Sequence, residues 1–131
     1  MSDPLSVDIV AADRMVWSGE ATIVLTRTVA GDIGILANHA PILSVIVPGT
    51  VEIRTPDGGY LVFAIDTGFI SVAKNHVSIL AEYAEPAEDV DVSQAQADLD
   101  AARGASDDAE GDQEAVIARA EARLRAAEKA R

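Results

Sequence analysis

The chain has 131 residues, a net charge of −12 and no cysteine. Its length fits one domain, or one domain with an appendage. The absence of cysteine excludes disulfides, zinc–thiolate sites and thiol nucleophiles, and with only two histidines a dedicated metal site is not expected. The acidic excess argues against nucleic acid as a partner, because binding to phosphates needs clustered lysine and arginine.

Nothing in the sequence predicts insertion into a membrane. No apolar run approaches the roughly 20 residues that are needed to cross a bilayer. The N-terminal residues MSDPLSVDIV lack the basic flank and the apolar core of a signal peptide. We therefore expect a cytoplasmic location.

Composition divides the chain into two parts. All five aromatic residues and most valines and isoleucines precede residue 84, whereas alanine, aspartate, glutamate, arginine and glutamine dominate after Pro86. This change predicts a β domain at residues 1–85 and a helical unit at residues 86–131, with the boundary near residues 84–90.

The β domain begins with two short strands and a shaped segment. Residues 5–9 alternate between apolar and polar, and residues 21–27 are rich in β-branched side chains, so both are predicted strands. The segment 31–41, GDIGILANHAP, cannot be one regular strand, because Gly31, Gly34 and Asn38 tolerate positive φ and Pro41 restricts the residue before it. Its apolar residues, Ile33, Ile35 and Leu36, are expected to be buried. Such shaped segments often meet a partner.

Two hairpins complete the β domain. The turn residues 56–59, PDGG, separate the alternating run 51–55 from the apolar run 60–65. A second hairpin spans residues 70–80, with its loop predicted at residues 74–76. Many short strands separated by turns predict an antiparallel sandwich or barrel.

The helical unit is predicted as an antiparallel hairpin with helices at about 91–103 and 113–129. Gly104 suits the end of the first helix, and Asp112 suits the N-cap of the second. Each helix carries one narrow apolar stripe, Val92, Ala95, Leu99 and Ala102 in the first and Ile117, Ala120, Leu124 and Ala127 in the second. These stripes are mostly alanine, and a buried methyl-sized group contributes only about 0.8 kcal/mol. We therefore expect a loosely held hairpin.

Charge is also unevenly distributed. Residues 1–85 carry a net charge of −6, residues 86–112 a net charge of −8, and residues 113–131 a net charge of +2. The natural partner of a basic helix would be an acidic surface. A solvated helix face, with cations near the negative end of the helix dipole, is the alternative interpretation. The cations of this helix are Arg119, Arg123, Arg125, Lys129 and Arg131.

Several segments together resemble one family, the epsilon subunit of bacterial F-type ATP synthase. They are WSG at 17–19, GDIGILANHAP at 31–41, PG at 48–49 and TGFISV at 67–72. The resemblance covers essentially the whole chain and is strongest between residues 8 and 80. It implies a ten-stranded β-sandwich followed by two helices, in agreement with the pattern of the residues.

The resemblance implies a non-catalytic rotor subunit of the proton-translocating enzyme. The sandwich would bind the gamma subunit and the polar loops of the membrane c-ring, at the cytoplasmic face of the cell membrane. It would thereby couple rotation to ATP synthesis in the alpha/beta hexamer. The helices would also extend along gamma and inhibit ATP hydrolysis, with loops of the beta subunits as their acidic partner.

Three interface residues follow from the resemblance by position. Asp32 matches the acidic residue of the family's GE/DxG turn, which faces the c-ring. Asn38 and His39 match the first two residues of the GHAP element near gamma, with Asn38 in place of glycine. For His39 the alternative is a turn histidine bonded to the backbone. His76, in the predicted loop of the second hairpin, needs no function.

Some members of the family bind ATP between the folded helices through an I/LDxxRA motif. Gln94 replaces the arginine of that motif and removes a permanent positive charge from the phosphate site. We therefore expect weak or no ATP binding and no other cofactor. Asp91 has a second interpretation, because Asp91 and Gln94 have the spacing of a capping box. The residues that match the site are Glu85, Val90, Asp91, Gln94, Arg119 and Arg123.

Rival interpretations belong to other classes. A stand-alone sensor of a nucleotide or small anion would also explain a mobile hairpin, and it is the alternative that we retain. A generic interaction domain does not account for residues 31–41. An enzyme is disfavoured, because the sequence shows no nucleophile with a base beside it and no GxxxxGK[ST] phosphate loop, so no catalytic residue is assigned.

Overall fold

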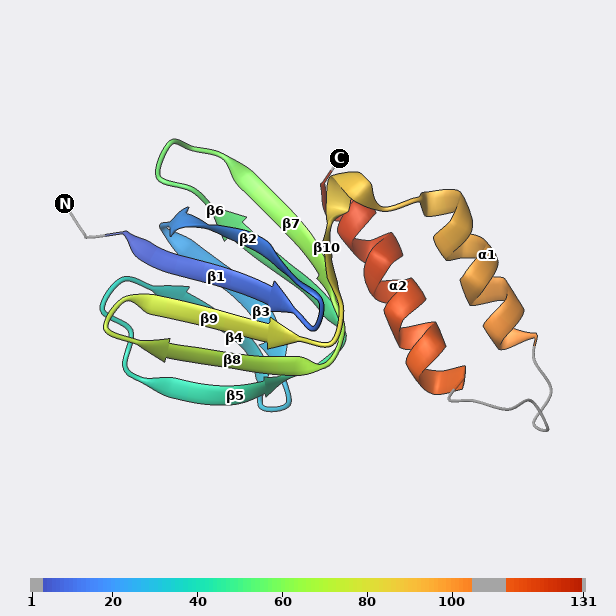
Figure 1. Ribbon diagram of the computed structural model, residues 1–131, viewed down its shortest axis with the longest axis horizontal. Coiled ribbons are helices and arrows are strands. Elements are labelled where there is room, and N and C mark those ends of the chain that lie inside the picture. Colours follow the sequence, from blue (N-terminus) through green and yellow to red (C-terminus); the bar gives the residue numbers. More distant parts are fainter. Residues whose placement is uncertain (1–3, 105–112, 131) are drawn as a thin grey trace.

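The computed structural model describes residues 4–104 and 113–130, and within these ranges it contains ten strands and two α-helices (Figure 1). The strands are β1 (Leu5–Ala11), β2 (Arg14–Ala21), β3 (Ile23–Thr28), β4 (Gly31–Leu36), β5 (Ile42–Ile46), β6 (Gly49–Arg54), β7 (Tyr60–Ile65), β8 (Gly68–Ala73), β9 (His76–Ala81) and β10 (Ala84–Pro86). A 3₁₀ turn at Ala87–Asp89 leads to α1 (Val92–Arg103), and α2 is Gln113–Lys129.

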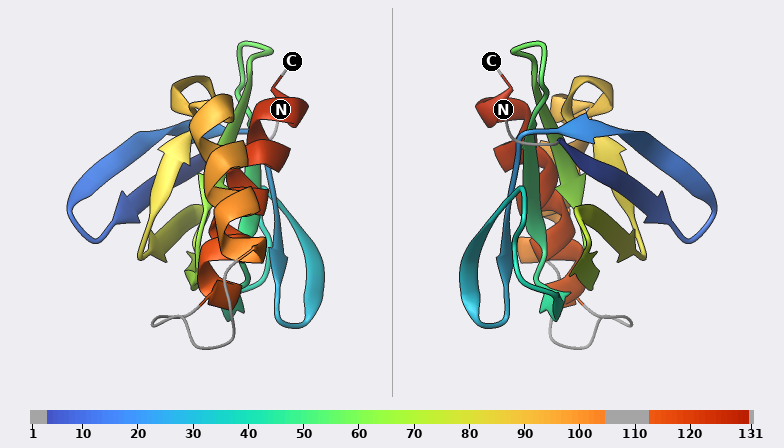
Figure 2. Two further views of the ribbon diagram at one scale, coloured as in Figure 1. Left: turned by 90° about the vertical axis from the view of Figure 1, so that its right-hand side faces the viewer. Right: turned by 90° about the vertical axis from the view of Figure 1, so that its left-hand side faces the viewer.

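The strands form one strongly bent sheet in the order β10-β7-β6-β3-β5-β8-β9-β1-β2, with β4 paired to β3. The last strand, β10, also contacts β1 and β2, so the sheet nearly closes into a barrel. Figure 2 shows the β1–β2 and β3–β4 hairpins on opposite sides of the molecule. The predicted β-sandwich followed by two helices is confirmed.

One strand pair departs from the antiparallel prediction. β1 pairs with β9 in parallel, from Ser6 opposite His76 to Ala11 opposite Ala81. All the other strand pairs among the described residues are antiparallel. The alternation of residues 5–9 predicts a strand but carries no information about the direction of a partner so distant in the sequence.

Both predicted hairpins are present. Between β6 and β7 the Thr55 N–H donates to the Gly59 carbonyl at 2.9 Å. Between β8 and β9 the turn has only two residues, Lys74 and Asn75, with φ of 51° and 63°. Positive φ at both central positions gives the turn the twist that suits adjacent antiparallel strands. The prediction that His76 lies in this loop is wrong, since His76 begins β9.

The shaped segment is a strand followed by a turn. Gly31 has φ of 117° and Asn38 has φ of 66°, as predicted for these positions. Gly34 lies in β4 without a positive φ, and the space beside it is limited, because a Cβ there would lie 3.1 Å from Leu25 Cδ2. Ile35 is fully buried, but Leu36 points outward and is exposed, so its predicted burial is wrong.

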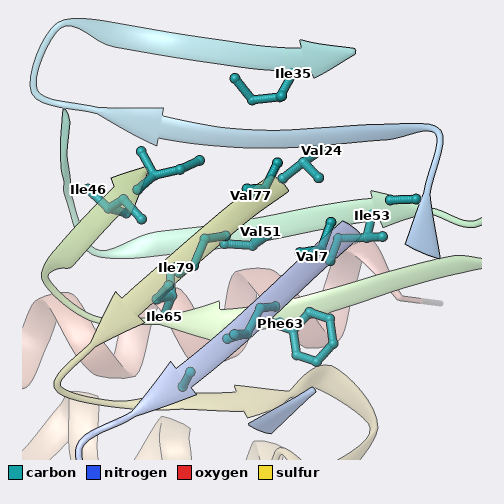
Figure 3. Packing of buried hydrophobic residues seen from close by; sticks show 14 of the residues in the cluster. Val7, Val24, Ile35, Ile46, Val51, Ile53, Phe63, Ile65, Val77 and Ile79 are labelled. Carbon is teal, nitrogen blue, oxygen red and sulfur yellow. The ribbon is translucent and has the colours of Figure 1, made fainter. Parts of the chain in front are cut away.

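A core of branched aliphatic side chains fills the space inside the bent sheet (Figure 3). The alternation of the strands places these residues on the inner face, while their sequence neighbours face outward. The largest fully buried members include Leu5, Ile9, Ile35, Ile46, Ile53, Ile65, Ile70 and Ile79. The resulting shell is a rigid scaffold for the features on its outer face.

Gly68 is expected to be essential for the packing of β8 against β9. A Cβ at this position would lie 2.0 Å from the Leu80 carbonyl oxygen, which belongs to the backbone of the paired strand. We expect Gly68→Ala to destabilise the chain by about 3 kcal/mol, the upper range for overpacking. Urea unfolding followed by Trp17 fluorescence measures the loss. Ser71→Ala, at an exposed position of the same strand, is the control, and equal stability of the two variants would contradict this close approach.

The helices extend from one side of the sandwich. α2 packs on β6 and β7, and α1 packs on α2 from the outside (Figure 1). α1 begins one residue after the predicted start, with Asp91 as its N-cap, and Gly104 is its C-cap as predicted. The predicted N-cap Asp112 lies outside the described residues. Neither described helix is long and apolar enough to span a membrane.

The apolar stripes of the helices are only partly as predicted. In α1, Ala95 and Leu99 are buried, but Val92 is exposed. In α2, Ala122 and Ala126 are buried in addition to the predicted Ala120. The physical reason is that α2 lies between α1 and the sheet, so it buries more than one stripe of its surface.

Candidate functional site

A row of apolar side chains crosses the outer face of five adjacent strands. Residues in register on neighbouring strands share one face of a sheet. From β5 through β8, β9 and β1 to β2, the register aligns Val45, Phe69, Leu80, Val10 and Met15. We call these five residues the apolar row.

The apolar row is on the surface and is not part of the core. Phe69, Leu80 and Met15 are 54%, 53% and 56% exposed. Leu43, on the same face of β5 as Val45, is 73% exposed. A contiguous apolar patch of this kind usually marks a surface that another protein covers.

A polar cluster lies on the same face beside the apolar row. Asp8 accepts a hydrogen bond from Ser18 Oγ at 2.7 Å, and its other oxygen lies 2.9 Å from His76 Nε2. In this cluster the serine is bonded to the carboxylate and not to the imidazole, so the hydrogen bond that activates a nucleophile is missing. The contact between His76 and Asp8 was not expected from the predicted loop position of His76. We interpret the cluster as structural.

Asn38 and His39 lie where β4 ends. The Asn38 N–H donates to Asn75 Oδ1 at 2.6 Å, which ties this turn to the β8–β9 turn. His39 Nδ1 lies 2.7 Å from the Ala40 carbonyl oxygen, and the His39 N–H donates to the Leu36 carbonyl at 3.2 Å. These contacts are the ones expected from the alternative interpretation of His39, a turn histidine that is bonded to the backbone.

Asp32 lies at the opposite end of β4. Its carboxylate accepts a hydrogen bond from Arg27 Nε at 2.9 Å, and both side chains are well exposed. The hydrogen bond and the charge of Arg27 hold the pKa of Asp32 below its ordinary value. The three predicted interface residues thus do not form one cluster, because Asp32 is separated from Asn38 and His39 by the length of a strand.

Three cations of α2 pair with carboxylates of the sandwich. Arg119–Asp66 has an Nη2–Oδ2 distance of 2.7 Å, Arg123–Glu85 an Nε–Oε1 distance of 2.6 Å, and Lys129–Glu52 an Nζ–Oε2 distance of 3.4 Å. We call these the docking ion pairs. The sequence predicted an acidic surface as the partner of this basic helix. In this structure the helix contacts acidic residues of the sandwich in the same chain.

The Arg123–Glu85 pair belongs to a half-buried network. The Tyr83 hydroxyl donates to Glu85, and the guanidinium of Arg119 lies 4.7 Å from the centre of the Tyr83 ring. Asp98 of α1 lies 3.8 Å from Arg123 Nη1. Burial, and then the hydrogen bond to Glu85, raise the pKa of Tyr83 well above 10. The network therefore links both helices to the strand that ends the sandwich.

Because the pKa values of both tyrosines are raised, we expect the folded chain to form tyrosinate only at unusually high pH. Burial and a hydrogen bond to Glu52 raise the pKa of Tyr60 to about 12, and the pKa of Tyr83 is also raised. The stability from keeping both rings neutral is complete below pH 10 and is lost as the pH rises from 10 through the folded pKa values. Absorbance at 295 nm should show almost no tyrosinate at pH 10 in the folded chain, whereas in urea the tyrosines should be about half ionised at that pH. Equal titration in both conditions would contradict these contacts.

The residues that match the ATP motif are only partly brought together. Glu85 and Arg123 are in direct contact, and Gln94 reaches the same region through a 2.8 Å hydrogen bond to Asp98. Asp91 accepts from the Gln94 N–H at 3.0 Å and so caps α1, as its second interpretation predicted. The Val90 N–H donates to the Ala87 carbonyl. Arg119 faces Asp66 instead.

Sequence reasoning missed several of these residues. Asp66 follows a buried strand, but no motif marks it as the partner of Arg119, because the two residues are distant in the sequence. Glu52 and Asp98 looked like ordinary surface acids. Phe69 and Leu80 carried a usable signal, since each occupies an outward position of an alternating strand. Their alignment into one row depends on the strand register, which the sequence does not display.

Comparisons with known proteins agree with this architecture. Residues 4–87 match the family model for the beta-sandwich domain of the ATP synthase delta/epsilon chain. The chain is 50% identical over 126 residues to the ATP synthase epsilon chain of Streptomyces avermitilis, covering 96% of this chain and 97% of that one. The chain belongs to the ATP synthase epsilon-chain family. The predicted family is therefore confirmed, and the protein is an accessory subunit of the ATP synthase and not a catalytic one.

One more relative and two solved structures are also similar to this chain. The epsilon chain of Rhodococcus jostii is 42% identical over 127 residues, covering 96% of this chain and 98% of that one. A chain in the structure of the Euglena gracilis mitochondrial ATP synthase, OSCP/F1/c-ring, aligns with a TM-score of 0.72 and 25% identity, covering 95% of this chain and 78% of that one. A chain of the Tetrahymena thermophila ATP synthase central stalk and c-ring shares the fold, with a TM-score of 0.63, 14% identity and coverage of 98% and 97%.

Proposed function

We propose that this chain joins the gamma subunit to the c-ring in the rotor of a proton-translocating ATP synthase, with the apolar row as its gamma-binding face. The exposed row across β5, β8, β9, β1 and β2 is the observation that carries the proposal. A rotor subunit must transmit torque, so its partners need a stiff surface. The row meets this need, because it lies directly over a core of fully buried isoleucines such as Ile70 and Ile79.

The far end of the β3–β4 hairpin is the proposed contact with the c-ring. Asp32 and Arg27 are both exposed there and paired only with each other among the described residues. Such an exposed pair contributes little to folding. Its charges are therefore available to polar loops of a ring subunit. Asn38 and His39, at the other end of β4, are assigned to the gamma side. The chain itself would be peripheral to the membrane, held at the cytoplasmic face through the complex.

The helices have a second proposed role, the inhibition of ATP hydrolysis. The docked hairpin relies on alanine packing and on the docking ion pairs, so its free energy of docking is modest. A released α2 would carry Arg119, Arg123 and Lys129 to acidic loops of the beta subunits in the alpha/beta hexamer. The same cations would then serve both positions of the helix.

A pull-down from membranes tests the rotor assignment. A tagged full-length chain should bring down gamma and the c-ring together. Asp32→Lys should retain gamma but lose most of the c-ring, whereas the control Asp57→Lys, an exposed acid of the β6–β7 turn, should retain both. Recovery of the parent chain alone would contradict the proposal and would favour the stand-alone sensor.

ATP binding is expected to be weak or absent. Arg119 and Arg123 are already paired with Asp66 and Glu85, so phosphates would have to displace two carboxylates. Gln94 offers no charge in compensation. Calorimetric titration of ATP into the parent chain should show no micromolar binding, and Gln94→Arg should bind more tightly than the parent. Tight binding by the parent would overturn this expectation.

A further inference from the structure

A groove on the far side of α2 brings together residues that were assigned separately above, Arg27 and Asp32 of the proposed c-ring contact and Lys129 of the docking ion pairs. It has a volume of about 660 Å³ and lies between the β3–β4 hairpin, the start of β6 and the C-terminal half of α2. It shares no lining residue with the cleft around Asp66, Asp98 and Arg123. The region that matches the ATP motif is therefore separate from it.

The groove exists because β3 and β6 separate. Their pairing ends where Leu25 faces Glu52. Beyond that point Thr26 Oγ1 donates to the Thr50 carbonyl at 3.1 Å. A side chain thus donates to the Thr50 carbonyl at the point where the two strands separate.

Three cations line this groove. Arg27 comes from β3, and Arg125 and Lys129 lie one helical turn apart on the same face of α2. The carboxylates that line it are Asp32 and Glu52, so the lining carries a net charge of +1 on a chain whose net charge is −12. The charge of Lys129 also contributes to the lowered pKa of Asp32, which places these groups within electrostatic reach of one another.

Arg125 is the cation best placed to take a ligand. Unlike Arg119 and Arg123, it forms no ion pair with any residue in the described part of the chain. A Cβ built on Gly49 would lie 3.8 Å from Arg125 Nη1, so the absence of a side chain at Gly49 leaves room beside the guanidinium. The planar fork of a guanidinium matches the geometry of a phosphate.

We propose that this groove binds a phosphate group, either inorganic phosphate or the terminal phosphate of a small phosphate ester, with Arg125 as the main ligand and Arg27 and Lys129 as supporting charges. Arg27 belongs to the sandwich, whereas the other two cations belong to α2. The site is complete only while α2 is docked. Bound phosphate therefore stabilises the docked hairpin by mass action, since it binds one state and not the other.

Titration of the full-length ¹⁵N-labelled chain with inorganic phosphate tests the proposal, at constant ionic strength held with sodium chloride. The amide signals of Gly34, Gly49 and Thr50 should shift and saturate. Arg125→Gln should weaken the binding at least about tenfold, the loss of one charge-assisted contact. Arg103→Gln, at an arginine that pairs with Glu121 away from the groove, should leave it unchanged. Amide exchange in α2 should slow at saturating phosphate.

A second arm uses ATP under the same conditions and distinguishes the two sources of phosphate. Shifts at the groove amides with phosphate alone identify the free ion, and shifts with both identify the wider class of phosphate esters. The proposal is overturned by shifts that do not saturate, by equal weakening in the two arginine variants, by unchanged exchange in α2, or by ATP shifts confined to Glu85 and Arg123 while the groove stays silent.

Discussion

We expect Phe69→Asp to abolish binding of the chain to gamma while leaving the sandwich folded. Phe69 lies between Val45 and Leu80 in the apolar row and is 54% exposed in the isolated chain. A carboxylate there is hydrated while the chain is alone. Under a partner it would be buried among apolar side chains without a cation, and charge burial of that kind is strongly unfavourable. Aromatic residues that a partner buries are also frequent sites of a large contribution to affinity.

The expected loss is at least about 3 kcal/mol, or more than about a hundredfold in affinity. Calorimetry with the full-length chain and purified gamma measures it, and urea unfolding of the free chain checks that the variant is folded. Val92→Asp is the matched control, because Val92 is 38% exposed in the first turn of α1, outside the strands that carry the row. It should bind gamma as the parent does. Parent-like affinity of Phe69→Asp would remove the apolar row from the interface.

Local chemistry accounts for the parts of the fold that the sequence predicted. Gly31 and Asn38 adopt positive φ, as their residue types suggest. Asp91 caps α1 because its carboxylate can accept a hydrogen bond from the N–H of Gln94, three residues later in the chain. The 51–65 hairpin follows from its turn residues. In each case the cause and the structure lie within a few residues of each other, so a linear sequence contains the necessary information.

The parts that sequence reasoning missed depend on contacts between distant residues. The parallel pairing of β1 with β9 joins the two ends of the β domain and has no local signal. Leu36 is exposed although it follows buried Ile35, because the face of a strand is set by its alternation and not by hydrophobicity alone. The same limit applies to the candidate site. A basic α2 was evident from composition, but its pairing with Asp66 and Glu85 required the packed structure.

The docking ion pairs make the position of α2 sensitive to a single carboxylate, Glu85. Its side chain and that of Arg123 are 13% and 17% exposed, so Glu85→Gln leaves a largely buried guanidinium without its main partner. Breaking a buried pair in this way costs about 3 kcal/mol. The free energy of docking is modest because the packed surface is mostly alanine. We therefore expect the variant to populate released α2 to a large extent.

Hydrogen exchange of the isolated chain measures this release directly, as faster exchange along α2 with an unchanged sandwich. Glu121→Gln is the control, because the exposed Arg103–Glu121 pair lies within the hairpin and contributes little. In the assembled enzyme Glu85→Gln should lower ATP hydrolysis, since the released helix carries its arginines to the beta subunits. A chain truncated after Glu88 should have the opposite effect. If neither change alters hydrolysis while exchange in α2 is accelerated, the hairpin moves as inferred but does not inhibit, and the inhibitory role is wrong for this protein.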